Sequence, residues 1–308
     1  MTDRKQPVVH AVVPAAGRGT RFLPITKSVP KEMLPIVDRP SIEYIVEEAT
    51  ESGITDMLFV TRANKQSIED YFDAEPGLEA DLAKAGKTAA LDVVNEYKRF
   101  ARIHSVRQGR PLGLGHAVLQ ARHHIGDAPF AVLLPDDLME PGAKLLRRMI
   151  EVRQALGGSV VALMRVTPEQ ATAYASTAVT PLPIPEGVNL DEGDLMRIDE
   201  VVEKPPLDEV KSEYAVIGRY LLDPAVFNAL EQIEPGAGGE YQLTDAYAKM
   251  IDLDPDQGGG LYGVVVNERR FDTGDKLGYL EANIALALAD PELGPALREY
   301  IRTEVDKG

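Results

Sequence analysis

The feature that most constrains the fold is an alternation of short apolar runs, rich in β-branched residues, with amphipathic stretches. The runs predict strands at 8–13, 57–61, 103–106, 130–134, 159–166, 214–222 and 261–266. Apolar residues at helical spacing predict helices at 41–52, 142–156, near 225–232 and near 242–252. This order is typical of an α/β fold, a Rossmann-like mixed, mainly parallel sheet with helices on both faces.

Three segments depart from that alternation. Residues 177–206 carry prolines, glycines and short apolar runs, which predict a smaller antiparallel excursion. Residues 78–100 are expected to form two helices broken at Gly86. We expect one domain over residues 6–274, and a C-terminal helical segment, 275–308, packed on it and interrupted near Asp290-Pro291.

Charge and composition exclude several classes of protein. The chain has 33 basic and 49 acidic residues, a net charge of −16, which argues against a nucleic-acid partner. The absence of cysteine excludes disulfides and thiolate chemistry, and the five histidines show no spacing typical of a zinc site. No apolar run approaches the ~20 residues of a membrane span. We therefore expect a cytoplasmic protein with no membrane partner.

The loop after the first predicted strand is the strongest candidate for ligand binding. Gly17-x-Gly19 permits close approach of the backbone to a phosphate or base. A Walker loop would need a following Gly-Lys-Ser/Thr, and a dinucleotide-binding loop would need a helix that the prolines at 24, 30 and 35 forbid. Residues 18–39 carry five cations against two anions, a local excess that suits a triphosphate or pyrophosphate.

The residues from Ala15 to Lys31, continuing through Met33-Leu34-Pro35, resemble the signature of bacterial sugar-1-phosphate nucleotidyltransferases. The segment 30–35, with Gln108-Gly109 and the run 113–117, is similar to UTP–glucose-1-phosphate uridylyltransferases. The matches continue in order to residues 271–274. The resemblance implies a nucleotide half at 6–137, a sugar-phosphate half at 138–274, and transfer of a uridylyl group from UTP to glucose 1-phosphate, with UDP-glucose and pyrophosphate as products.

The resemblance also implies a set of site residues. Its catalytic residues are Arg21, Lys31, Asp136 and Lys204; its nucleotide-binding residues are Ala15, Ala16, Gly17, Gly19, Gln108 and Gly113; its sugar-phosphate-binding residues are Glu203, Lys204, Gly218, Glu240 and Asp137. Mg²⁺ is expected on Asp136, with Asp272 as a second ligand. From the residues themselves, Asp136-Asp137 directly follows a buried strand, where ligands bind in parallel sheets.

Some alternatives stay open. The Gln108 amide matches the N3–H and O4 edge of a pyrimidine, which UTP and dTTP share, so a thymidylyltransferase is an alternative. A second alternative is a nucleotide-sugar-binding regulator without catalysis. The presence together of Arg21, Lys31, Asp136 and Lys204 argues against it. Where the family usually has Tyr-Gly, this chain has Tyr174-Ala175, which alters the sugar pocket if that position needs a positive φ. A homo-oligomer, dimer or tetramer, is also expected.

Overall fold

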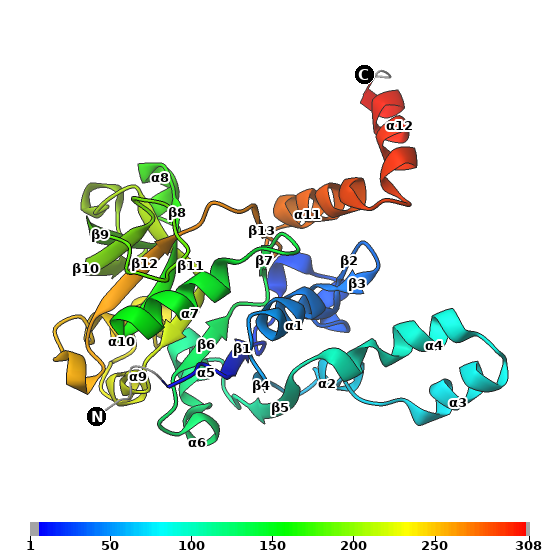
Figure 1. Ribbon diagram of the computed structural model, residues 1–308, viewed down its shortest axis with the longest axis horizontal. Helices are drawn as coiled ribbons and strands as arrows, with labels where there is room; N and C mark the ends of the chain where they lie inside the picture. The colour runs from blue at the N-terminus through cyan, green and yellow to red at the C-terminus, as the bar shows by residue number, and fades with distance from the viewer. Residues whose placement is uncertain (1–5, 306–308) are drawn as a thin grey trace.

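The centre of the structure is a mixed sheet of nine strands within residues 6–305, the part of the chain that the computed structural model describes (Figure 1). The strands lie in the order β5-β4-β1-β6-β11-β8-β12-β10-β9. Their bounds in that order are Arg102–Arg107, Asp56–Thr61, His10–Pro14, Phe130–Leu133, Tyr214–Leu222, Ser159–Arg165, Leu261–Val265, Leu195–Glu203 and Ala175–Pro181.

Strand direction divides the sheet into parts. β5, β4, β1 and β6 are parallel, and β11 lies antiparallel between β6 and β8. β8 and β12 are again parallel, whereas β10 and β9 add two antiparallel strands at the far edge. The expected mixed α/β sheet is confirmed, although parallel pairs do not predominate as expected: within residues 6–305, neighbours in the strand order form four parallel and four antiparallel pairs. The excursion predicted at 177–206 forms the antiparallel edge.

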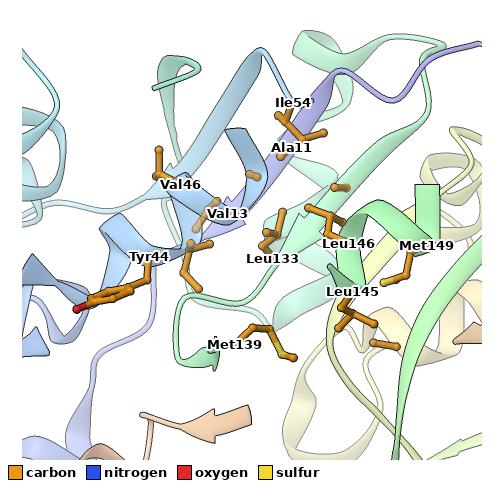
Figure 2. Close-up of a cluster of buried hydrophobic side chains, with 14 of the residues drawn as sticks. Ala11, Val13, Tyr44, Val46, Ile54, Leu133, Met139, Leu145, Leu146 and Met149 are labelled. Atoms are coloured by element: carbon orange, nitrogen blue, oxygen red, sulfur yellow. The ribbon is translucent and has the colours of Figure 1, made fainter. Parts of the chain in front are cut away.

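Helices cover both faces of the sheet because successive strand residues point to opposite sides. Ala11 and Val13 of β1 join one apolar cluster, with α1 (Ser41–Glu51), α7 (Leu145–Leu156) and Ala282 of α11 (Lys276–Ala289). Figure 2 shows part of this cluster. Val12 joins the other, with residues of α5 (Leu114–Leu119), α6 (Arg122–Ile125), α9 (Ala225–Leu230) and α10 (Leu243–Ala248).

The remaining elements lie around this core. A helical arm of α3 (Pro76–Lys84) and α4 (Thr88–Val94) extends from the sheet beyond α2 (Gln66–Tyr71), and α8 spans Pro168–Ala171 (Figure 1). α12 (Gly294–Val305) follows the expected break after α11, where Asp290 Oδ1 accepts hydrogen bonds from two backbone N–H groups. In the described part of the chain, no helix has the length and apolar character needed to cross a membrane.

Two short ribbons lie outside the main sheet. One pairs β2 (Pro35–Ile36) with β3 (Arg39–Pro40). The other pairs β7 (Asp137–Met139), which follows β6, with β13 (Arg270–Asp272), so that Asp272 lies opposite Asp137. This second ribbon, which the apolar pattern did not predict, brings residues far apart in the sequence to the carboxyl end of β6.

Candidate active site

The glycine loop after β1 folds back onto Lys31 and does not continue as an α-helix. The N–H of Ala15 donates to a carbonyl of β4 at 2.9 Å, which anchors the start of the loop. Residues 20–33 then form short 3₁₀ turns, as expected where prolines interrupt the chain. Gly19 has a φ of +62°, and a Cβ there would meet the side chain of Lys31 at 3.2 Å. Glycine therefore allows the loop to lie against this lysine.

A cavity of about 380 Å³ opens beside this loop and is lined by cations from two loops. Arg18, Lys27 and Lys31 come from the N-terminal loop, and Arg62 and Lys65 come from the segment after β4. The two loops meet because β1 and β4 are parallel and end at the same edge of the sheet. The cations after β4 were missed in the sequence, although their position just beyond a predicted strand could have identified them.

A buried ion pair fixes the second of these loops. Lys65 Nζ donates to both carboxylate oxygens of Glu32, at 2.8 and 2.7 Å, and the two side chains are only 7% and 1% exposed. Burial lowers the pKa of Lys65, while the carboxylate opposes that change. Because Lys65 neutralises it, Glu32 does not repel a phosphate bound in the cavity.

Asp136 and Asp272 face a small space beside Gly274. A Cβ on Gly274 would lie 2.8 Å from Asp136 Oδ2 and 3.1 Å from Asp272 Oδ1, so both oxygens border the space that glycine leaves. Carboxylate oxygens are the ligands that Mg²⁺ prefers. The two residues therefore fit the divalent cation that the sequence implied. The Nη1 of Arg21 donates to the carbonyl of Gly274 at 3.3 Å, which brings a predicted catalytic cation to the same point.

Lys31 joins the cationic cavity to this carboxylate pair, with its Nζ 2.5 Å from Asp136 Oδ2. Burial alone would raise the pKa of Asp136, but the charge and hydrogen bond of Lys31 outweigh burial and lower it. The pKa of Asp272 is raised by burial, with Arg270 opposing the change and Asp136 adding to it. Lys31 therefore stabilises the charged form of Asp136, whereas a bound cation would stabilise the charged form of Asp272.

Asp137 holds the neighbouring strands together. Its side chain is buried, Oδ2 accepts the N–H of Gly218 at 2.6 Å, and Oδ1 accepts a hydrogen bond from Nε of Arg270 at 2.5 Å. A Cβ on Gly218 would lie 2.7 Å from the same Oδ2, so glycine is needed for this close approach. Both oxygens are thus engaged by protein donors, and Asp137 positions the turn that carries Asp136.

A second cavity, of about 410 Å³, is lined by both members of the carboxylate pair. The predicted residues that line it are Arg21, Asp136, Asp137, Glu203, Lys204, Gly218, Glu240 and Asp272. Tyr174, which the resemblance had placed near the sugar, lines it as well, and so do Thr244 and Arg270, which were not predicted as site residues. Arg270 directly precedes the motif at 271–274, which is the signal that could have indicated it.

Glu203 and Lys204 differ in their freedom to bind a ligand. Glu203 Oε2 accepts a hydrogen bond from the hydroxyl of Thr244 at 2.6 Å, which orients the carboxylate. Lys204 has a φ of +44°, and its N–H donates to the carbonyl of Tyr174 at 3.0 Å. The Lys204 side chain is 60% exposed and lies 3.6 Å from Glu203, so its ammonium can reach an anion in the cavity.

Ala175 is accommodated without backbone strain. It is buried at the start of β9, where it pairs with Glu203 on one side and Val216 on the other. The residues other than glycine with a positive φ in the described chain are Val37, Asn64 and Lys204, so this position does not need a glycine for its conformation. Its methyl group lines the second cavity and narrows it relative to glycine.

A third cavity, of about 250 Å³, lies beside Gln108 and Ala16. Gln108 Nε2 donates to the carbonyl of Gly113 at 3.0 Å and lies 3.1 Å from His116 Nδ1. Within residues 6–305 no donor engages Oε1 of Gln108, which leaves this oxygen to accept the N3–H of a pyrimidine. Gly113 has a φ of +105°, and a Cβ there would meet the carbonyl of Tyr241 at 2.7 Å.

The predicted residues therefore fall into three adjoining cavities and their supports. Gly17 and Lys31 line the cationic cavity, and Ala16 and Gln108 line the third. Ala15, Gly19 and Gly113 line none of the three and shape the loops around them.

Comparison with known proteins identifies the family to which the chain belongs. The model of the family described as nucleotidyl transferase matches residues 10–287, and the chain belongs to that family. Among curated relatives, two UTP–glucose-1-phosphate uridylyltransferases of Bacillus subtilis are 44% and 41% identical, over 98% and 97% of this chain and 97% and 98% of their own length. The resemblance predicted from the sequence is confirmed.

Solved structures of UDP-glucose pyrophosphorylases share the fold of this chain. A UTP-bound UGPase from Acinetobacter baumannii has a TM-score of 0.83 and 38% identity, over 96% of this chain and 98% of that one. A UDP-glucose pyrophosphorylase complexed with UDP-glucose has a TM-score of 0.79 and 37% identity, over 92% of this chain and 100% of that one.

Proposed function

We propose that this chain transfers the uridylyl group of UTP to glucose 1-phosphate, giving UDP-glucose and pyrophosphate. The main support is the contact between Lys31 and Asp136. Lys31 lines the cationic cavity, Asp136 lines the second cavity, and their ion pair places the two cavities side by side. A phosphate oxygen of glucose 1-phosphate attacks the α-phosphorus of UTP. The bond from that phosphorus to the bridging oxygen breaks, and pyrophosphate leaves with the electron pair.

The chain's own residues contribute positioning and charge neutralisation. Arg21 and Lys31 neutralise the pyrophosphate leaving group, and Lys204 orients the attacking phosphate. Glu203 and Glu240 accept hydrogen bonds from sugar hydroxyls, and Gln108 binds the base. No side chain has to remove a proton, because the attacking phosphate is already ionised at neutral pH.

Mg²⁺ is the divalent cation that we propose for this site, held by Asp136 and Asp272. The support is the pair of carboxylate oxygens that border the space beside Gly274. When bound, the cation supplies neutralisation of the phosphate charge that develops in the transfer.

UTP is favoured over dTTP by the relatives, which at 40–44% identity carry the name UTP–glucose-1-phosphate uridylyltransferase. A solved structure from Bacillus anthracis, described as a "Putative Glucose-1-Phosphate Thymidylyltransferase", shares 23% identity and a TM-score of 0.65, which supports a common fold alone. A pyrophosphate-release assay with UTP, dTTP, ATP and GTP, each with several sugar 1-phosphates, tests the proposal. Release from dTTP but not UTP would favour the thymidylyltransferase, and binding without release would favour the regulator.

Asp136→Asn tests the catalytic assignment because it keeps the shape of the side chain and removes its charge. We expect turnover to fall by at least ~10²-fold, as for loss of one preorganised charge contact. Asp272→Asn should cause a smaller loss. Turnover of Asp136→Asn near that of the wild type, with the same dependence on Mg²⁺ concentration, would refute the assignment.

We also propose that the chain self-associates through α11. Leu277, Leu280 and Ile284 recur on one face of that helix and are 65%, 55% and 47% exposed. An apolar stripe of this kind is stabilised by burial against a second copy. Leu280→Glu should lower the molar mass measured by light scattering during gel filtration. A wild-type chain that elutes with the mass of a monomer would contradict the proposal.

A further inference from the structure

A cluster of histidines lies at the end of the sheet opposite the proposed active site. β1 begins at His10 and β4 begins at Asp56, and the two residues are direct neighbours in the register of this parallel pair. The catalytic loop leaves β1 at its other end. Because a strand rises about 3.3 Å per residue, about 13 Å of β1 separate His10 from Pro14. The cluster is thus a separate place in the molecule.

Three imidazoles surround the one carboxylate. His124 of α6 has its Nε2 2.7 Å from Asp56 Oδ1, and His10 Nδ1 lies 3.4 Å from the same oxygen. His104 of β5 has its Nε2 3.4 Å from the other oxygen, Oδ2. The rings of His104 and His124 are 4.9 Å apart. Adjacent strands and the helix above them therefore direct their side chains to one point.

The spacing of these atoms is that of a metal-ligand set. One atom each from His10, Asp56 and His124 lie within 4.8 Å of one another. Ligands at about 2.0–2.1 Å from a tetrahedral zinc ion are about 3.3 Å apart. The separation of His10 Nδ1 from Asp56 Oδ1, 3.4 Å, is close to this value, whereas His124 Nε2 lies at hydrogen-bond distance, 2.7 Å, and would move outward by a few tenths of an ångström around a cation. Within the described residues, His10 Nδ1 is buried and, although it lies 3.4 Å from Asp56 Oδ1, it does not meet that oxygen or any other group with the geometry of a hydrogen bond. That atom is consequently available to donate its lone pair to a cation.

We propose that His10, Asp56 and His124 bind a divalent transition-metal cation such as Zn²⁺ or Co²⁺. Two imidazoles and one carboxylate are a donor set that such cations take and that Mg²⁺ does not favour. The bound cation would connect β1, β4 and α6, whose side chains it would hold together. Its role is therefore stabilisation of this end of the sheet, independent of the reaction.

The test uses the full-length chain without an affinity tag, stripped with a chelator and returned to excess Mg²⁺. Mg²⁺ occupies the carboxylate pair of the active site, so that added Co²⁺ reports on nitrogen ligands. We expect one equivalent of Co²⁺ to bind, with the visible absorption of a tetrahedral complex, and Zn²⁺ to displace it and raise the melting temperature. Asp136→Asn should retain this equivalent.

His124→Gln and His10→Gln should each weaken Co²⁺ binding by at least ~10-fold. Changing a residue that only hydrogen-bonds to a metal ligand already costs about this much affinity, so loss of a ligand itself should cost no less. His123→Gln is the matched control, because His123 is the exposed neighbour of His124 and lies outside the cluster. Pyrophosphate release with Mg²⁺ should be unchanged in all three, which also shows that they fold. No stoichiometric Co²⁺ binding by the wild type, or equal affinity in His124→Gln and His123→Gln, would overturn the proposal.

Discussion

Arg219 carries a fully buried positive charge beside the turn that bears Asp136. Its guanidinium is 0% exposed and forms a forked pair with Glu48 of α1, with Nε 3.0 Å from Oε1 and Nη2 2.7 Å from Oε2. Nη1 also donates to the carbonyls of Leu134 and Gly218, at 3.3 and 3.0 Å. The pair therefore connects β11, α1 and the turn beyond β6.

Arg219→Met removes the cation and leaves Glu48, whose side chain is only 9% exposed, without its partner. Breaking a buried pair in this way costs about 3–5 kcal/mol. The entropy of unfolding is about 2.1 cal/mol/K per residue, so over 308 residues each kcal/mol lowers the melting temperature by about 1.5 °C. We expect a decrease of about 5–8 °C.

A double-mutant cycle separates the charge from general loss of packing. Glu48→Leu alone should also destabilise the chain, because it leaves the guanidinium buried and unpaired. The combination Arg219→Met/Glu48→Leu should be more stable than either single variant, since an apolar pair can replace a buried ion pair at little cost. Arg219→Lys should lie between wild type and Arg219→Met, because an ammonium cannot reproduce the fork.

The assay is thermal unfolding followed by circular dichroism, at fixed protein and Mg²⁺ concentrations. Destabilisations of the two single variants that simply add in the double variant would refute the reasoning, because they would show that the charges do not depend on each other. A decrease of less than about 1 °C in Arg219→Met would refute it as well, because it would leave less than about 1 kcal/mol for the uncompensated carboxylate.

Three further predictions concern the loops around the cavities. Gly113→Ala should lower kcat/KM for UTP, because its Cβ would clash with Tyr241, whereas Gly53→Ala, with a φ of +94° and nothing within 4 Å, should only reduce stability; equal activities in the two variants would contradict this. Lys31→Ala should impair use of UTP and, in reverse, of pyrophosphate, and Lys204→Ala chiefly that of glucose 1-phosphate; steady-state kinetics that cannot distinguish the two would count against the division. Gln108→Leu should reduce kcat/KM for UTP and should bring it closer to the values for ATP and GTP, while the ratio of kcat/KM for UTP to that for dTTP changes much less. Unchanged discrimination against ATP and GTP would show that Gln108 does not bind the base.

The sequence predicted the elements that local pattern controls. The strand predicted at 214–222 coincides with β11, and the helix predicted at 142–156 differs from α7 only at its first turn. The prolines after Gly19 correctly excluded a dinucleotide-type helix. The ribbon of β7 and β13 was missed because each of its strands has three residues, too few to show a period.

The sequence by itself determined the class of fold, the family and the position of the candidate anion-binding loop. It did so through composition, periodicity and ordered motifs, which are all properties of neighbouring residues. Tertiary structure alone decided which distant side chains meet. Asp272 reaches Asp136 through the pairing of β13 with β7, and Arg219 reaches Glu48 because β11 lies beside β6. The histidines, whose spacing gave no sign of a zinc site, gather around Asp56 because parallel strands begin at one edge of the sheet. Such contacts depend on strand order and register, which no local pattern specifies.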